Sequence, residues 1–238
     1  MFPDVDSAGR QLYRAFYTMV SFVTLGASLS SYLAVQETNV ISLSETEFLI
    51  CSVIAALSGA FSLSSLVNAS PLSLVPSFQY LDVNDDVADP GVTIAGIKRN
   101  DALKFEPRGL TRITRHPLIL PVVPWGVATS YLAGGRTSDF LIFGGLSLYA
   151  ILGCFCQDLR VVREEGTVGT VFEPSLITIS TKLNDFYTQT SFVPFGALSD
   201  GRQSWVSLWK EFPYIPFIAG IPFATLIEKA GLQSLHRL

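Results

Sequence analysis

The sequence has little charge, few histidines and few cysteines. Only 15% of its 238 residues are Asp, Glu, Lys or Arg, whereas a soluble domain usually has nearer a quarter. Its net charge of −4 gives no basis for binding nucleic acid, which calls for a basic surface. The three cysteines, Cys51, Cys154 and Cys156, lie within apolar stretches, so no disulfide framework is expected. The composition therefore argues against an ordinary soluble domain.

The chain has long uncharged runs instead, at residues 15–36, 48–80, 117–135, 140–157 and 212–227. About 20 apolar residues cross a bilayer core as a helix. Prolines at 71 and 76 should end the second helix early, and three prolines make the last run the weakest candidate. We predict an all-α integral membrane bundle of about five transmembrane helices, in one domain over 1–238, with spans at 14–36, 48–68, 117–135, 139–157 and 212–228.

Positive charge is distributed unevenly around these spans. Of the 16 Lys and Arg residues, only Arg136, Lys229 and Arg237 fall on the side opposite the N-terminus. Basic residues stay on the cytoplasmic side of a membrane, which corresponds to the stroma in a plastid. We therefore predict that the N-terminus and the long loops 81–116 and 158–211 share that side. Aromatic and polar residues alternate over 181–205, which predicts an amphipathic segment at the membrane interface.

The stretch "RITRHP" at 112–117 carries two arginines, and a long uncharged run begins immediately after them. Arginines at this place mark the membrane edge, because headgroups attract them and hydrocarbon disfavours them. We take Arg115 and His116 as candidate ligand-binding residues at the interface, with Asp200 and Arg202 as neighbours. The acidic residues of 82–101 lack the spacing of a calcium loop, so no metal site is expected.

Three stretches, in this order, resemble motifs of the plastid 15-cis-zeta-carotene isomerases and their wider NnrU family. They are "RITRHP" at 112–117, "TSFVPFGALSDGRQ" at 190–203 and "KEFPYIPF" at 210–217. Residues 12–33 match the same family more weakly. The resemblance implies an integral membrane isomerase of carotenoids that holds a b-type haem through histidines, in a thylakoid or envelope membrane.

The chain departs from this family at the implied haem ligands. Thr129 occupies the position of one ligand, and Gly126 occupies that of a nearby cysteine; the other ligand belongs to a helix that has no counterpart in the matching part of this chain. His116 and His236 are expected at opposite membrane faces, so they cannot hold one haem. We therefore expect no haem b, and instead a non-catalytic protein that binds a carotenoid, a chlorophyll or lipid, or acts as a structural subunit beside other membrane proteins of a photosystem-type plastid complex.

On this interpretation, Trp125 and Thr129, four residues apart on one helix face, should line the cleft that replaces the haem pocket. Two alternatives remain open. The first is an active zeta-carotene isomerase with altered ligation, in which Cys154 or Cys156 gives a single thiolate ligand. The second is a membrane methyltransferase, because such enzymes carry an RHP-type motif and a later acidic pair, here Glu164 and Glu165, that could together grip a cofactor.

Overall fold

The computed structural model describes residues 7–35, 40–67, 70–73, 78–80, 93–94, 97–99, 104–162 and 176–237. Within these residues the chain is mainly helical, as predicted. Its elements in chain order are α1 (Ser7–Ala34), α2 (Glu45–Ser64), β1 (Phe78–Tyr80), β2 (Thr93–Ile94), β3 (Ile97–Arg99), η2 (Gly109–Arg112), α3 (Val122–Leu132), α4 (Thr137–Asp139), η3 (Phe140–Gly144), α5 (Gly145–Val162), α6 (Leu176–Gln189), α7 (Gly196–Ser199), α8 (Trp205–Glu211) and α9 (Tyr214–Arg237).

Three helical segments are long and apolar enough to cross a membrane: Glu45–Ser64, Thr137–Leu159 and Tyr214–Ser234. Thr18–Ala34 is a shorter apolar helical segment. The membrane character of the chain is therefore supported, whereas the predicted number of five spans is not confirmed. The prolines of the last segment predict the weakest of the spans, yet Tyr214–Ser234 is among these three segments. Pro216 lies in the first turn of α9, where its missing N–H costs nothing, and α9 continues through Pro222.

The predicted span at 117–135 is shorter in the structure. Residues 117–121 form turns, and α3 covers only Val122–Leu132, 11 residues, or about 16 Å of helix. Gly134 and Gly135 follow it with φ of 136° and 66°, a backbone region that glycine adopts without strain. Ala128 and Thr129 are each 2% exposed. The third apolar run therefore forms a partly buried helix that is by itself shorter than a bilayer core, and a complete span over 117–135 is not confirmed.

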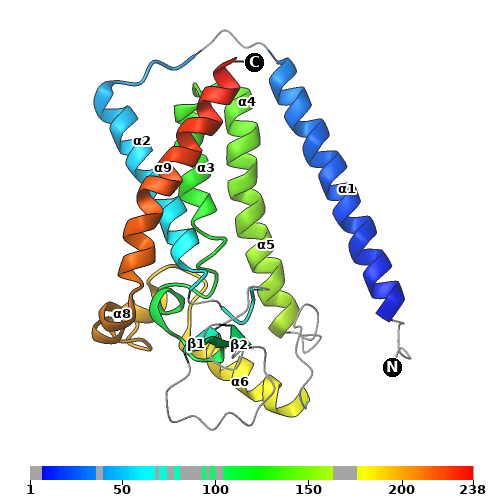
Figure 1. Cartoon of the computed structure of the whole chain (residues 1–238), viewed down its shortest axis with the longest axis vertical. Coiled ribbons are helices and arrows are strands. Elements are labelled where there is room, and N and C mark those ends of the chain that lie inside the picture. Colours follow the sequence, from blue (N-terminus) through cyan, green and yellow to red (C-terminus); the bar gives the residue numbers. More distant parts are fainter. Residues whose placement is uncertain are drawn as a thin grey trace.

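Helices α2, α3 and α9 pack together, and α5 packs on α3 (Figure 1). Small residues allow α2 and α9 to approach closely. A Cβ on Gly220 would lie 3.1 Å from the Cα of Ala60, and a Cβ on Gly59 would lie 2.7 Å from the Cβ of Ala224. Helices in lipid associate through such close contacts, because burying apolar surface gives no advantage over lipid itself.

Helix α1 stands apart from the bundle along most of its length (Figure 1). Its contact with the bundle lies near its C-terminal end, where the hydroxyl of Tyr32 donates to Oδ1 of Asp139 at 2.6 Å. The Tyr32 ring also packs edge-on against Phe143. The apolar side chains of its described part remain exposed, including Phe16, Phe22 and Val23.

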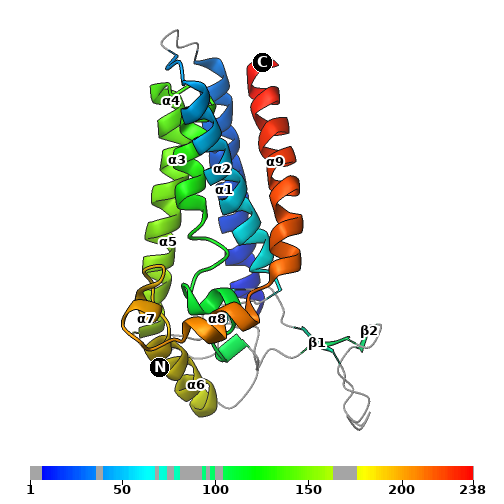
Figure 2. The same ribbon diagram turned by 90° about the vertical axis from the view of Figure 1, so that its left-hand side faces the viewer.

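Helices α6, α7 and α8 gather at one end of the bundle (Figure 2). Leu110, Ile113, Leu198 and Leu208 form a buried core there. Near this end lies a small antiparallel sheet, in the order β1-β3-β2, which the sequence analysis did not predict. The acidic loop residues 82–92 lie outside the described residues.

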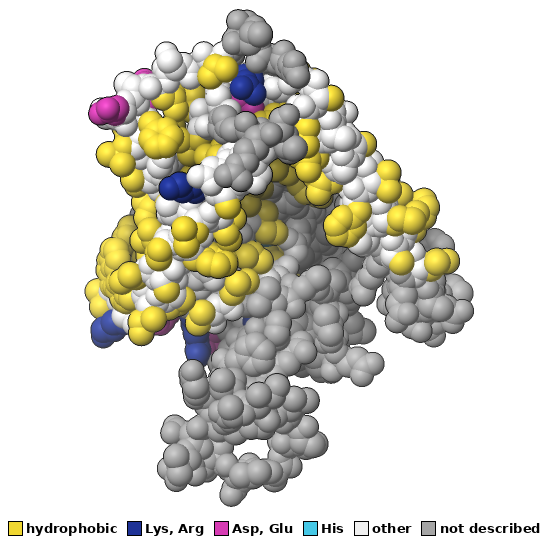
Figure 3. All heavy atoms as spheres, turned by 45° about the horizontal axis from the view of Figure 1, so that its top comes forward, with side chains coloured by type: hydrophobic (Ala, Val, Ile, Leu, Met, Phe, Trp, Pro, Cys, Tyr) yellow, Lys and Arg dark blue, Asp and Glu magenta, His cyan; other side chains and the backbone are white. Residues whose placement is uncertain are grey.

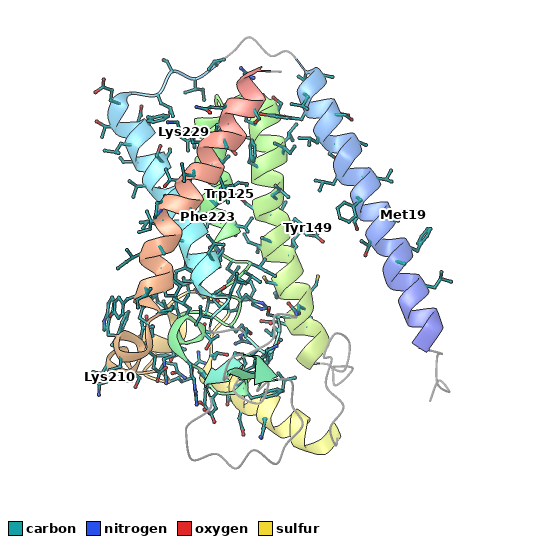
Figure 4. The ribbon with its side chains drawn as sticks, viewed as in Figure 1. Met19, Trp125, Tyr149, Lys210, Phe223 and Lys229 are labelled. Carbon is teal, nitrogen blue, oxygen red and sulfur yellow. The ribbon has the colours of Figure 1, made fainter. Side chains whose placement is uncertain are left out.

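Hydrophobic side chains cover much of the described helical surface, with few charged side chains between them (Figure 3). Tyr149 extends from α5 toward the side on which α1 lies (Figure 4), and it is 67% exposed. A surface of this composition suits contact with lipid chains. The side of the membrane on which each end lies stays a prediction.

We expect Gly220→Leu to destabilise the protein in detergent by about 1–3 kcal/mol, because the new side chain must displace the backbone of α2. A thermal unfolding curve measures this change. Gly231→Leu on the same helix is the matched control, since a Cβ there meets nothing within 4 Å. Equal melting temperatures for the two variants would contradict the close α2–α9 packing.

Candidate functional site

Three donors meet at the carboxylate of Asp158, near the C-terminal end of α5. His116 Nε2 lies 2.8 Å from Oδ1 of Asp158, and because a carboxylate only accepts, Nε2 carries the proton. The hydroxyl of Tyr187 donates to the same oxygen at 3.0 Å. Arg115 Nη1 donates to Oδ2 at 3.3 Å. We call these four residues the Asp158 cluster.

The Asp158 cluster is largely shielded from solvent. The side chains of Arg115 and Asp158 are each 13% exposed, and that of His116 is 2% exposed. Arg115 also lies over the ring of Tyr187, 4.4 Å from its centroid, a cation–π contact. Burial, and next the charge of Asp158, raise the pKa of Tyr187, so its phenol stays protonated and donates. The ion pair is therefore held by the neutral phenol of Tyr187 as well as by charge.

A cavity of about 370 Å³ lies beside this cluster. Its walls come from the end of α2 and the following turn, the turn before α3, and α5. The lining residues are Ser65, Leu66, Ser70, Leu72, Ser73, Arg115, His116, Pro117, Leu118, Ile119 and Gln157. The amide nitrogen of Gln157 donates to the carbonyl oxygen of Leu72 at 2.8 Å, which joins α5 to the turn after α2. Arg115 and His116, both predicted as ligand-binding residues, therefore line one cavity.

The segments 112–117 and 190–203 contact each other directly. Arg115 N donates to the carbonyl oxygen of Ser191 at 3.0 Å, and Phe195 N donates to that of Ile113 at 2.8 Å. Phe195 has a φ of 64°, which is uncommon for a side chain of this size. Its ring stacks on Trp205. The two stretches thus form one structural unit although about 75 residues separate them.

Arg112 joins this unit to α8. Its guanidinium forms two hydrogen bonds to Glu211, from Nε to Oε2 at 2.9 Å and from Nη2 to Oε1 at 2.8 Å, and its Nη1 bonds Gln203. Gly109 N also donates to Glu211, at 3.0 Å. The side-chain hydrogen bond from Arg112 is the main reason that the pKa of Glu211 is lowered. These residues stabilise the end of the bundle rather than line the cavity.

Asp200 and Arg202 form an exposed pair, with Nε of Arg202 donating to Oδ2 of Asp200 at 2.8 Å. Arg202 Nη1 also donates to the carbonyl oxygen of Thr190 at 2.8 Å. Arg115 Nη2 donates to that same oxygen at 3.0 Å. The two arginines therefore meet at one backbone carbonyl, but neither Asp200 nor Arg202 lines the cavity.

A second polar contact joins α3 to α9 within the bundle. Thr129 Oγ1 donates to Oε1 of Glu228 at 2.6 Å, and Trp125 Nε1 donates to Oε2 at 2.8 Å. Glu228 belongs to the apolar segment Tyr214–Ser234, and Trp125 lies behind α9 within the bundle (Figure 4). Trp125 and Thr129 do share a face, as predicted, but that face holds a carboxylate of the chain itself.

These residues do not fit the haem that the resemblance implies. The side chain at position 129 is a threonine already bonded to Glu228, and it is not an iron ligand. A Cβ on Gly126 would lie 2.3 Å from Ser147 Oγ and 2.4 Å from the carbonyl oxygen of Phe143, so the packing leaves no room for a cysteine. His236 belongs to the last turn of α9, and that end of α9 lies at the opposite end of the bundle from α6 (Figure 1), which carries Tyr187, the residue that shares Asp158 with His116.

The thiols and the acidic pair named in the alternatives have different places. Cys154 is buried and Cys156 is exposed, so the two do not share one environment. Glu164 and Glu165 lie outside the described residues. The acidic partner that the structure gives to Arg115 and His116 is Asp158.

Sequence reasoning missed Asp158, Tyr187 and Glu228. Asp158 and Glu228 are the first charged residues after long uncharged runs, so hydropathy alone identifies them only as the ends of spans. A signal was available, since a charge within or next to a membrane helix needs a partner. The identity of that partner was not readable along the chain.

We expect Glu211→Gln to make the stability of the folded protein less sensitive to a fall in pH. Because the pKa of Glu211 lies below its ordinary value of 4.5 in the folded state, its ionised form adds stability above that value, which is lost as the pH falls through the lowered pKa. Melting temperatures between about pH 6 and pH 3 measure this. Glu45→Gln, at an exposed position, is the control; the idea fails if both variants follow the wild-type acid profile.

The chain was compared with models of known protein families, with curated proteins and with solved structures. The family described as NnrU protein matches residues 4–220, which include α1, the Asp158 cluster and the first part of α9. No curated protein and no solved structure matched the chain. The match covers well over half of the sequence, and the chain therefore belongs to the NnrU family.

Proposed function

We propose that this NnrU-family protein is a non-catalytic membrane subunit. In this proposal it binds pigment (a carotenoid or a chlorophyll) or lipid, or serves as a structural member, in a photosynthetic membrane complex of a plastid. The observation that carries the proposal is the hydrogen bond of 2.6 Å from Thr129 to Glu228. At the position where the resemblance implies a haem ligand, the side chain joins two helices instead.

The packing around Gly126 supports the same proposal. The backbone of η3 and the side chain of Ser147 lie where a cysteine side chain would have to stand. Ser147 Oγ lies 3.0 Å from the carbonyl oxygen of Val123 and 3.1 Å from that of Phe143, so α3 and α5 are joined at this level. Both implied positions on α3 are thus used for helix packing.

The exposed side chains of α1 favour a subunit that has neighbours. Phe16 is 61% exposed, Phe22 is 70% exposed and Leu148 of α5 is 57% exposed. In a membrane such side chains contact lipid, pigment or another protein. A partner along α1 would give this helix packing beyond what the described part of its own chain provides.

We expect the protein isolated from its native membrane to migrate with a larger complex and to contain pigment or lipid but no haem. Absorption spectra before and after reduction, with extraction of bound pigments, measure this. Expression in carotenoid-producing bacteria with a desaturase, kept in the dark, should give no isomerised product. A Soret band that responds to reduction, or isomerisation in the dark, would instead establish an active isomerase.

A further inference from the structure

Large apolar side chains form an exposed surface where α8 meets the start of α9. Their exposed fractions run from 45% for Phe195 to 83% for Ile215. A contiguous apolar surface of this kind marks a contact with a partner or with a membrane. We call it the aromatic surface, and its members are Phe195, Trp205, Val206, Trp209, Tyr214 and Ile215.

Contacts within the chain hold the aromatic surface in shape. The ring of Phe195 stacks on Trp205, with centroids 6.1 Å apart. Trp205 and Trp209 lie four residues apart, on one face of α8. The hydroxyl of Tyr214 donates to the carbonyl oxygen of Trp209 at 3.0 Å, and the ring of Phe212 contacts both of these side chains. The surface is therefore formed by the fold itself.

The side chains of this surface combine apolar rings with polar groups. In the part of the chain that the structure describes, neither the indole N–H of Trp205 nor that of Trp209 donates to a protein acceptor. Lys210 lies on the side of α8 away from the rest of α9 (Figure 4). Tryptophan and tyrosine are enriched where the hydrocarbon of a bilayer meets its headgroups, because the ring is apolar and its N–H or O–H is polar. The composition therefore favours a membrane interface over water or hydrocarbon.

The position of α8 agrees with that depth. Helix α8 runs across the direction of the long helices (Figure 2), and only Phe212 and Pro213 separate it from α9. From Tyr214 to Lys229, an exposed charge on α9, the helix rises about 22 Å. A bilayer core is about 30 Å thick. An apolar band that begins at Lys229 therefore continues past the start of α9 to the level of α8.

We propose that the aromatic surface lies in the interfacial layer of the bilayer, at the depth of the lipid ester groups, and anchors this end of the bundle there. The sequence predicts an interfacial segment over 181–205. Leu183 and Phe186 of α6 are 9% and 0% exposed, so the side chains free to contact lipid belong instead to α8 and its two neighbours. The proposal does not rest on the proposed function, because it concerns lipid contact outside α3.

Tryptophan fluorescence of the full chain in phosphatidylcholine vesicles tests this depth. The lipids carry bromine near the ester end or near the methyl end of their acyl chains, and iodide is the quencher in water. The chain has three tryptophans, so the difference between the wild type and the double variant Trp205→Phe and Trp209→Phe isolates the two surface indoles. We expect bromine near the ester end to quench this signal about twofold more than bromine near the methyl end, and iodide to quench it little.

A second site calibrates the depth. Leu148 is 57% exposed and lies near the middle of the candidate span Thr137–Leu159. Leu148→Trp, added to the double variant, should be quenched most by bromine near the methyl end. If the double variant does not fold, Trp125→Phe leaves only the two surface indoles and gives the comparison directly.

Three results would overturn the proposal. Strong quenching by iodide would place the surface in water, where a soluble protein could bind it. Strongest quenching by bromine near the methyl end would place it deep in hydrocarbon. The same order of quenching for Leu148→Trp and for the surface indoles would show that the surface has no depth of its own. A haem Soret band would reject the proposed function and leave these depths as measured.

Discussion

The carboxylate of Asp158 is the contact on which the functional end of the bundle depends. It accepts hydrogen bonds from Arg115 and His116, which are neighbours in the turn before α3, and from Tyr187 of α6. A buried charge without such partners is strongly unfavourable, so these segments must converge on the end of α5. Their convergence places Arg115 and His116 in the cavity wall. It also holds the turn against which the 190–203 segment forms its backbone hydrogen bonds.

Carboxylates also join pairs of helices at other levels of the bundle. Glu228 joins α9 to α3 through Trp125 and Thr129, and Asp139, which is fully buried, joins α4 to α1 through Tyr32. In a bilayer, an apolar helix surface gains little free energy when it exchanges lipid for another apolar helix. Polar contacts and the close approach of small residues therefore determine which helices pack together. Gly59 and Gly220 supply the close approach between α2 and α9.

Membership of the NnrU family and the use of α3 for packing have to be considered together. The chain keeps the segments that join the turn before α3 to 190–203 and to α8. On the α3 face that the resemblance assigns to haem, it has a threonine bonded to a carboxylate and a glycine covered by η3. These contacts are the basis of the proposal that the protein is a binding or structural subunit.

Hydropathy and motif order were sufficient to predict a helical membrane protein of the NnrU family and to single out Arg115 and His116. These properties can be inferred from short stretches of sequence, because an apolar run reflects the apolar surroundings of its residues. The length of α3 and the partners of the charges could not be read in this way. Asp158 and Glu228 stand at the ends of apolar runs, and their partners are 42 residues away for His116 and 103 for Trp125. Which donor meets which carboxylate depends on how helices pack side by side, and that arrangement is a property of the folded chain as a whole.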